Sequence, residues 1–293
     1  MDSLGWLVLA SSSSFLYGLS HIFARLSLVH VHPVGVAGIF TLVNLVIAAP
    51  IGFTTVAFEA YRWQAIVGFV VMGLFGFGGL RVLMAIGIHF LGASRNAPIS
   101  GIYPLFTTLG GSLLFQEQPG LGVWVGIVLI VCGVMWLSQE GDEGTTWDRK
   151  YIALPILQAL FRSIGALSQK LGLIYMNAPM FAIAIGGISG GCCILIYGWF
   201  CRKDENVCRF NTVGVLFGVL LGLTNTAALY LFTVALASSD VSLVVPVIST
   251  SPLFTLLLAK LFLRNLENVG REALYGGIVI VVGTVLITFS AGR

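Results

Sequence analysis

The chain carries very little charge. Only 9% of its 293 residues are Asp, Glu, Lys or Arg, whereas 57% are apolar, and the mean hydropathy is +0.98. Soluble domains carry about 25% charged residues, so this composition excludes a soluble protein and predicts a membrane-embedded one. The net charge of +3 is small and scattered along the chain, which argues against nucleic acid as a partner.

Several signals of chemistry are also missing. The five cysteines lack the spacing of metal ligands and no HExxH motif occurs, so we predict no metal, no cofactor and no catalytic residues. All twelve acidic residues lie at the ends of apolar segments or between them. This absence of a buried carboxylate disfavours an intramembrane hydrolase and weakens the case for export of organic cations. The first apolar segment has no basic residues before it, so we expect it to be retained as a span.

Ten apolar segments have about the length that a membrane helix needs, roughly 20 residues. They cover approximately Leu4–Leu28, Val34–Phe53, Trp63–Phe90, Asn96–Phe115, Gly120–Leu137, Tyr151–Tyr175, Pro179–Phe200, Val213–Leu236, Val241–Leu263 and Tyr275–Phe289. The longest polar connection, Gln139 to Lys150, separates two sets of five. We therefore predict an all-α polytopic membrane protein with ten transmembrane helices and two domains, residues 1–145 and 146–293.

One sequence pattern occurs twice, 148 residues apart. Pro98 and Pro104 correspond to Pro246 and Pro252, and Leu-Phe-Thr follows the second proline of each pair. Because each half holds an odd number of spans, the second five-helix repeat enters the membrane from the opposite side, which predicts two inverted repeats. Prolines remove helical hydrogen bonds. Their pairing favours bending points for alternating access, and purely architectural kinks are the alternative.

Two arginines, Arg81 and Arg162, lie deep inside predicted spans. A central arginine costs about 2.5–3.5 kcal/mol on insertion scales, so each should face water, backbone carbonyls or an anionic ligand. The glycine run before Arg81 predicts a loosened helix. The other substrate-binding candidates are polar side chains that can hydrogen-bond a solute, namely Tyr17, His21, Tyr103, Asn225 and Tyr230.

Several segments resemble the EamA domain of the drug/metabolite transporter superfamily. They are Leu91–Ser94, Pro104–Phe106, Leu113–Glu117 and Gly126–Val134, with a second copy at Ser238–Val244, Pro252–Phe254 and Gly277–Val285. The resemblance covers nearly the whole chain and implies ten helices in two inverted repeats around a central cavity. The chain departs from the family's pattern twice. The acidic residue Glu117 has no counterpart near Asn265 in the second copy, and Arg81 stands where relatives carry an aromatic or aliphatic residue.

The leading hypothesis is a secondary transporter that moves a small polar metabolite by alternating access. The carboxylate or phosphate of the metabolite would be held by Arg81 and Arg162. Whether transport is coupled to protonation of His21, to antiport of a second solute or to neither is left open. The alternatives are an exporter of amphipathic drugs or aromatic amino acids and, less favoured, an intramembrane enzyme. We expect an integral protein of the plasma (inner) membrane, monomeric or homodimeric, with the lipid bilayer and a small-molecule solute as partners. The Lys and Arg bias of short loops places the termini outside, whereas the family pattern places them in the cytoplasm.

Overall fold

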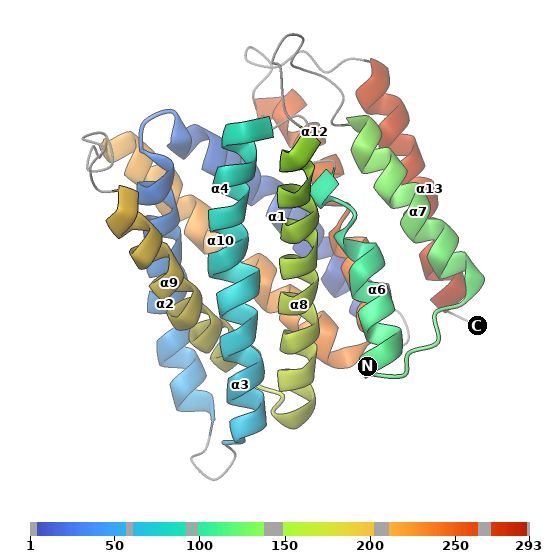
Figure 1. Cartoon of the computed structure of the whole chain (residues 1–293), viewed down its shortest axis with the longest axis horizontal. Coiled ribbons are helices and arrows are strands. Elements are labelled where there is room, and N and C mark those ends of the chain that lie inside the picture. Colours follow the sequence, from blue (N-terminus) through green and yellow to red (C-terminus); the bar gives the residue numbers. More distant parts are fainter. Residues whose placement is uncertain are drawn as a thin grey trace.

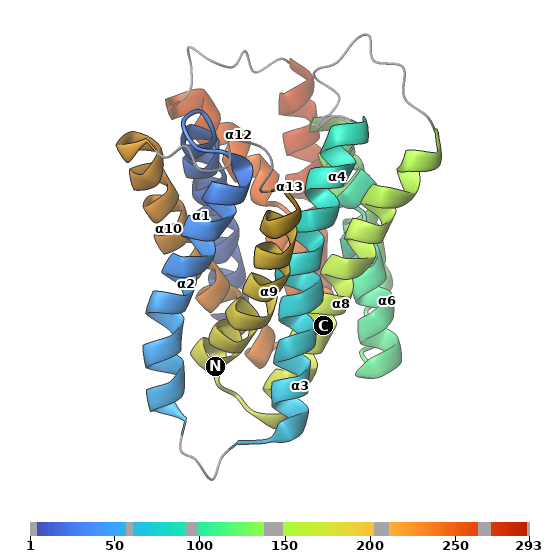
Figure 2. The same cartoon turned by 60° about the vertical axis from the view of Figure 1, so that its left-hand side comes forward.

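The computed structural model describes residues 5–56, 61–91, 96, 99–137, 149–201, 211–262 and 271–291. Every regular element within these ranges is a helix, and none of them contains a strand. The helices form one bundle with most of their axes running along its height (Figures 1 and 2), and both termini lie in the lower half of the view in Figure 1. The all-α prediction is confirmed.

The helices follow the predicted spans closely. The first half contains α1 (Gly5–Leu28), α2 (Pro33–Thr55), α3 (Trp63–Val71), η2 (Met72–Gly79), α4 (Leu80–Leu91), α6 (Tyr103–Leu114) and α7 (Leu121–Leu137). The second contains η3 (Arg149–Ile152), α8 (Ala153–Tyr175), α9 (Pro179–Cys201), α10 (Thr212–Ser238), α11 (Val241–Ile248), α12 (Ser251–Phe262) and α13 (Arg271–Ala291).

Within the described ranges, five helices are long and apolar enough to cross a membrane. They are Gly5–Leu28, Gly35–Thr55, Trp63–Met84, Pro179–Phe200 and Thr212–Ser238, and shorter apolar helices cover Leu121–Trp136, Val241–Thr255 and Tyr275–Ser290. Helix α8 has 23 residues but lies outside this set. Its sequence is interrupted by polar side chains such as Gln158, Arg162 and Gln169, which makes it the least apolar of the long helices. Gln158 and Gln169 lie on its buried face, whereas apolar side chains such as Leu160 and Ile174 are exposed on the other.

The contacts between helices are reciprocal between the two halves. Helix α1 packs against α10 and α12 of the second half, and α8 packs against α3 and α6 of the first half. Helix α2 packs against α9, and α7 pairs with α13 at one edge of the bundle (Figure 1). Each contact thus has its counterpart when the halves are exchanged, which is the arrangement that interlocked repeats require.

Glycines let these helices approach closely. A Cβ atom added to Gly126 of α7 would lie 2.6 Å from the Gly283 carbonyl oxygen of α13, and one added to Gly283 would lie 2.7 Å from the Gly126 carbonyl oxygen. Gly190 of α9 has a similar contact with η2, where its Cβ would lie 2.8 Å from the Gly73 oxygen. Such close approach is the main source of association between helices in lipid, where no hydrophobic force drives them together.

Both proline-containing segments are broken at equivalent positions. A turn at residues 101–102 precedes α6, and a turn at residues 249–250 separates α11 from α12. Leu105 N–H donates to the Ile102 carbonyl at 3.0 Å, and Leu253 N–H donates to the Thr250 carbonyl at 2.9 Å, so the two turns share one hydrogen-bond pattern.

The positions of the prolines explain these breaks. Pro104 and Pro252 are each the second residue of a new helix, where the missing N–H has no acceptor to lose. Pro246 lies inside α11, and Pro98 lies outside the described residues. The predicted kinks are therefore complete breaks in both halves, and their role in bending stays a prediction.

The loosened helix predicted before Arg81 is a π-helix. Element η2 covers eight residues, Met72–Gly79, and joins α3 to α4. A Cβ atom on Gly79 would lie 2.8 Å from the Leu74 carbonyl oxygen, five residues earlier, and 3.0 Å from the Phe161 ring. π-Helical turns are rare and occur mostly at functional sites. Here the wider turn changes the direction in which Arg81 leaves the helix.

Candidate solute-binding site

One face of α1 becomes more exposed along its length. Ala10, Ser14, Tyr17 and His21 share this face because they are spaced by three or four residues. Ala10 is 0% exposed and Ser14 is buried, whereas Tyr17 is half-buried and His21 is exposed. Buried residues such as Gly18, Ser20 and Ile22 surround this exposed position. We infer that His21 faces a solvent-accessible space within the bundle, which we call the hollow.

Arg162 of α8 lies in the same hollow. It occupies the middle of the helix face that otherwise consists of buried residues such as Ala159, Ala166 and Gln169, yet its own side chain is exposed. Its guanidinium carbon lies 3.9 Å from the centre of the Tyr103 ring. A cation over an aromatic face gains roughly 0.5–2 kcal/mol depending on desolvation, so the ring holds the charge in place without neutralising it.

Tyr103 forms the floor beneath Arg162. It is the first residue of α6, directly after the helix break, and only 4% of its surface is exposed. Its backbone carbonyl accepts hydrogen bonds from Ser163 (2.9 Å) and Thr107 (2.9 Å). Its hydroxyl lies beside Ser249 of the other helix break but makes no hydrogen bond of good geometry. The two breaks therefore meet at this floor.

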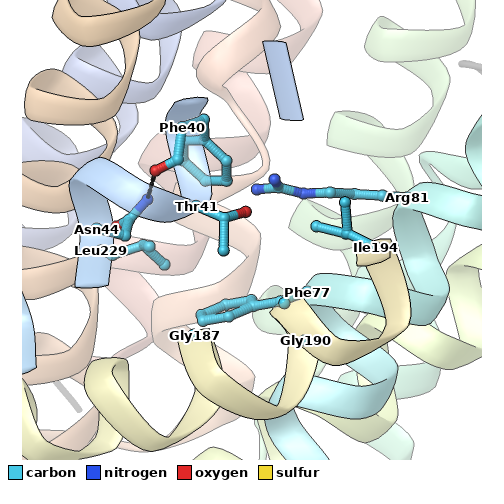
Figure 3. Close-up of a pocket in the computed structure, with 10 residues that line it drawn as sticks. Phe40, Thr41, Asn44, Phe77, Arg81, Gly187, Gly190, Ile194 and Leu229 are labelled. Atoms are coloured by element: carbon cyan, nitrogen blue, oxygen red, sulfur yellow. Dashed lines mark hydrogen bonds between the residues drawn. The ribbon is translucent and has the colours of Figure 1, made fainter. Parts of the chain in front are cut away.

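Arg81 lies in a crevice between α2, α9 and α10. Phe40, Thr41, Asn44 and Phe77 line it, and Gly187, Gly190 and Gly191 of α9 form another wall (Figure 3). The guanidinium carbon lies 3.7 Å from the centre of the Phe40 ring. Free space in the crevice is about enough for one water molecule.

Electrostatic interactions connect five of the predicted residues. Arg162 and Arg81 both act on Tyr17, and Arg162 also acts on His21 and Tyr103. In the described part of the chain no carboxylate comes within 4.0 Å of either arginine. The structure thus brings Tyr17, His21, Tyr103 and Arg162 together, whereas Arg81 lies in the separate crevice, within electrostatic reach of Tyr17.

The other two predicted residues lie elsewhere on α10. Asn225 shares a helix face with Gly218 and Leu221, which are buried where α10 meets α1 and α2. Tyr230 is 38% exposed and shares the opposite face with Leu216 and Leu223, which are also exposed. The structure does not bring Tyr230 to the group around Arg162.

Hydrogen bonds fix the helices around the hollow. His21 Nδ1 lies 3.2 Å from the Thr255 hydroxyl of α12, and the Ser14 and Thr250 hydroxyls lie 3.0 Å apart. Asn44 joins α2 to α10 because its amide oxygen accepts from the Thr226 hydroxyl at 2.8 Å.

Sequence reasoning missed Phe40 and Thr41. A phenylalanine or a hydroxyl residue in an apolar span has no pattern that separates a site residue from a packing residue. Arg81, and Asn44 as a lone amide in an apolar helix, were the available signals for the crevice.

A charged cluster lies on the other side of the floor, near the termini. The Glu117 carboxylate, 8% exposed, accepts hydrogen bonds from the backbone N–H groups of Val241 (2.8 Å) and Ser242 (3.0 Å) at the start of α11. Lys170 Nζ donates to the carbonyls of Leu236 and Ser239, both at 2.7 Å, at the end of α10. Burial and the Glu117 charge raise the pKa of the adjacent Asp240 carboxyl, and Lys170 opposes this shift.

Comparison with known proteins identifies the family. The model of the EamA-like transporter family matches residues 4–139 and again residues 149–289. The chain belongs to the EamA-like transporter family. It is therefore an integral membrane protein built from two copies of the family's unit, and the resemblance seen in the sequence is confirmed.

Individual proteins are also similar to the chain. An uncharacterized transporter of Archaeoglobus fulgidus is 22% identical to the chain over 190 residues. These residues make up 65% of this chain and 64% of that relative, so the match spans a little under two thirds of the relative's length. A solved crystal structure superposes with a TM-score of 0.80 at 15% identity and covers 98% of this chain and 97% of its own. At that identity the likeness shows the fold alone.

Proposed function

We propose that this EamA-like transporter moves a small polar metabolite that bears a carboxylate or phosphate group, by alternating access. The observation that carries the proposal is Arg162. Its charge faces the hollow, rests on Tyr103 and has no described carboxylate within ion-pair distance. A membrane protein keeps such a charge at considerable cost, and guanidinium is the group best suited to hold a carboxylate or phosphate by paired hydrogen bonds.

The neighbouring side chains supply the remaining recognition. Tyr17 and His21 lie on one face of α1 next to Arg162 and can donate hydrogen bonds to a polar solute. The Tyr103 hydroxyl is buried without a hydrogen bond of good geometry, and a buried hydroxyl normally has a partner. In this proposal the Tyr103 hydroxyl forms a hydrogen bond with the solute or with a water molecule that binds together with the solute.

Alternating access is supported by the unequal sealing of the two ends. Toward the termini, the interior is filled by a cluster of buried apolar residues that includes Trp6, Ala10, Leu173, Val241 and Val244. Toward the opposite end, His21 and Arg162 are exposed. In this proposal the present conformation is open at the His21 end, and motion at the two helix breaks opens the other end.

Transport in proteoliposomes tests the proposal. Vesicles that contain the parent protein or Arg162→Ala are assayed for uptake of carboxylate- and phosphate-bearing solutes, and Arg25→Ala serves as a control that removes an arginine near the end of α1. We expect Arg162→Ala to abolish uptake and Arg25→Ala to retain it. Undiminished anion uptake by Arg162→Ala rejects the assigned role. If the parent prefers hydrophobic cations to organic anions, the drug-exporter alternative is correct.

A further inference from the structure

The two arginines occupy separate places. Arg162 rests on Tyr103 in the hollow with His21, whereas Arg81 rests on Phe40 in the crevice beside α9 (Figure 3). Tyr17 is in electrostatic reach of both arginines and is the group that acts on Arg81. The site therefore has two cationic positions, and Tyr17 interacts electrostatically with both.

A solute with a single charge leaves one of these positions uncompensated. The described residues place no carboxylate within 4.0 Å of either guanidinium group, and the contacts with Phe40 and Tyr103 stabilise the charges without cancelling them. Electrostatic interactions are strong in a site of low dielectric. The solute that matches this arrangement best carries two negative charges.

The crevice limits what can bind at Arg81. Its free space is close to that of one water molecule, and its walls are the Phe40 and Phe77 rings and the backbone of the α9 glycines. The Thr41 hydroxyl already donates to the Ala37 carbonyl at 2.8 Å, and the Asn44 amide donates to the Phe40 carbonyl at 3.0 Å. The donors left for a ligand are those of the Arg81 guanidinium. A carboxylate is larger than one water molecule, so it would pair with this guanidinium without entering the free space of the crevice.

We infer that the preferred solute is a small dicarboxylate, with one carboxylate at Arg162 and the other at the guanidinium of Arg81. This inference rests on the proposed function and adds a second anionic group to the solute. Tyr17 would contact the carbon chain or its hydroxyl substituents midway. Recognition at both ends makes Arg81 the residue that distinguishes dicarboxylates from monocarboxylates.

Binding of succinate and butyrate tests the inference, because both acids have four carbons and differ by one carboxylate. Affinities are measured by calorimetry on the detergent-purified full chain, for the parent, Arg81→Gln and Arg162→Gln. Loss of a charged bidentate contact weakens binding about 10- to 100-fold. We expect Arg81→Gln to lose that factor for succinate while its butyrate affinity stays within about twofold, and Arg162→Gln to weaken both acids.

Two controls keep the outcomes distinct. Arg81→Lys retains the charge and should recover part of the succinate affinity, and the melting temperature of each variant without ligand shows whether it folds. Equal affinity of the parent for the two acids, or an unchanged preference in Arg81→Gln, overturns the inference but leaves the proposed function intact. If no anion binds to the parent or is taken up by its vesicles, the proposed function fails as well.

Discussion

The carboxylate of Glu117 provides the sharpest test of how the closed end is held together. It belongs to the loop between α6 and α7, in the first repeat, and caps the start of α11, in the second, through two N–H groups at 2.8 and 3.0 Å. In Glu117→Gln one oxygen remains as an acceptor, while the amide NH2 faces the second N–H group. The variant therefore loses one charge-assisted hydrogen bond and the favourable charge at a helix N-terminus.

The size of this loss follows from the two contributions. A hydrogen bond to a charged group contributes about 1.5–3 kcal/mol, and a charge at a helix N-terminus contributes about 0.3–1 kcal/mol. Removing the Glu117 charge also removes its repulsion with Asp240, which offsets a small part of the lost stability. We expect the free energy of unfolding to fall by about 2–4 kcal/mol.

Equilibrium unfolding in mixed micelles, with sodium dodecyl sulfate as denaturant, measures this change. Glu117→Asp is the matched control, because it keeps the charge on a side chain shorter by one methylene and should recover part of the stability. A free energy of unfolding for Glu117→Gln within about 0.5 kcal/mol of the parent refutes the reasoning, since a surface substitution has an effect of that size.

Two further predictions concern stability. Asp240 makes no side-chain cap bond, and its folded-state pKa is raised above the usual 3.8, so its ionised form destabilises the fold at neutral pH. Unfolding measurements should find Asp240→Asn equal to or more stable than the parent at pH 7, with any gain gone below about pH 4. A clear loss of stability at pH 7 would contradict this reasoning. Gly126→Ala should lower the free energy of unfolding by about 1–3 kcal/mol, because its Cβ would lie 2.5 Å from Ile287 Cγ1 and 2.6 Å from the Gly283 oxygen. Gly38→Ala in α2 is the control: its Cβ meets nothing within 4 Å, so it should raise the free energy of unfolding by about 0.5–1 kcal/mol. Equal effects of the two substitutions would show that α7 and α13 do not pair closely.

Much of the fold follows from local sequence signals. Apolar length defines where the helices lie, and the repeated prolines mark the breaks, because a proline nitrogen cannot donate within a helix. The glycine run before Arg81 indicated a loosened helix, and the structure shows a π-helix there. These features depend on residues near one another in the chain, which is why they can be predicted from it.

The arrangement of the candidate site depends more on tertiary contacts. Tyr17 and His21 share a helix face by their spacing alone, but the stacking of Arg81 on Phe40 and of Arg162 on Tyr103 requires the packing of separate helices. Tyr230 has the same chemistry as Tyr17, yet it lies on an outward face with Leu216 and Leu223. The weak amphipathicity of α10 gave no basis for choosing its inward face.

Thiol accessibility at two positions tests the central claim, that the bundle encloses a hydrated space open at one end at a time. Ala10→Cys lies in the sealed cluster and is 0% exposed before substitution, and Thr255→Cys lies beside His21. Each is introduced singly, with the native cysteines replaced by serine, and labelled in membranes with an impermeant thiol reagent. We predict fast labelling at position 255 and slow labelling at position 10, with a transported solute changing the two rates in opposite directions. Equal rates at both positions, or no labelling at position 255, would contradict the account.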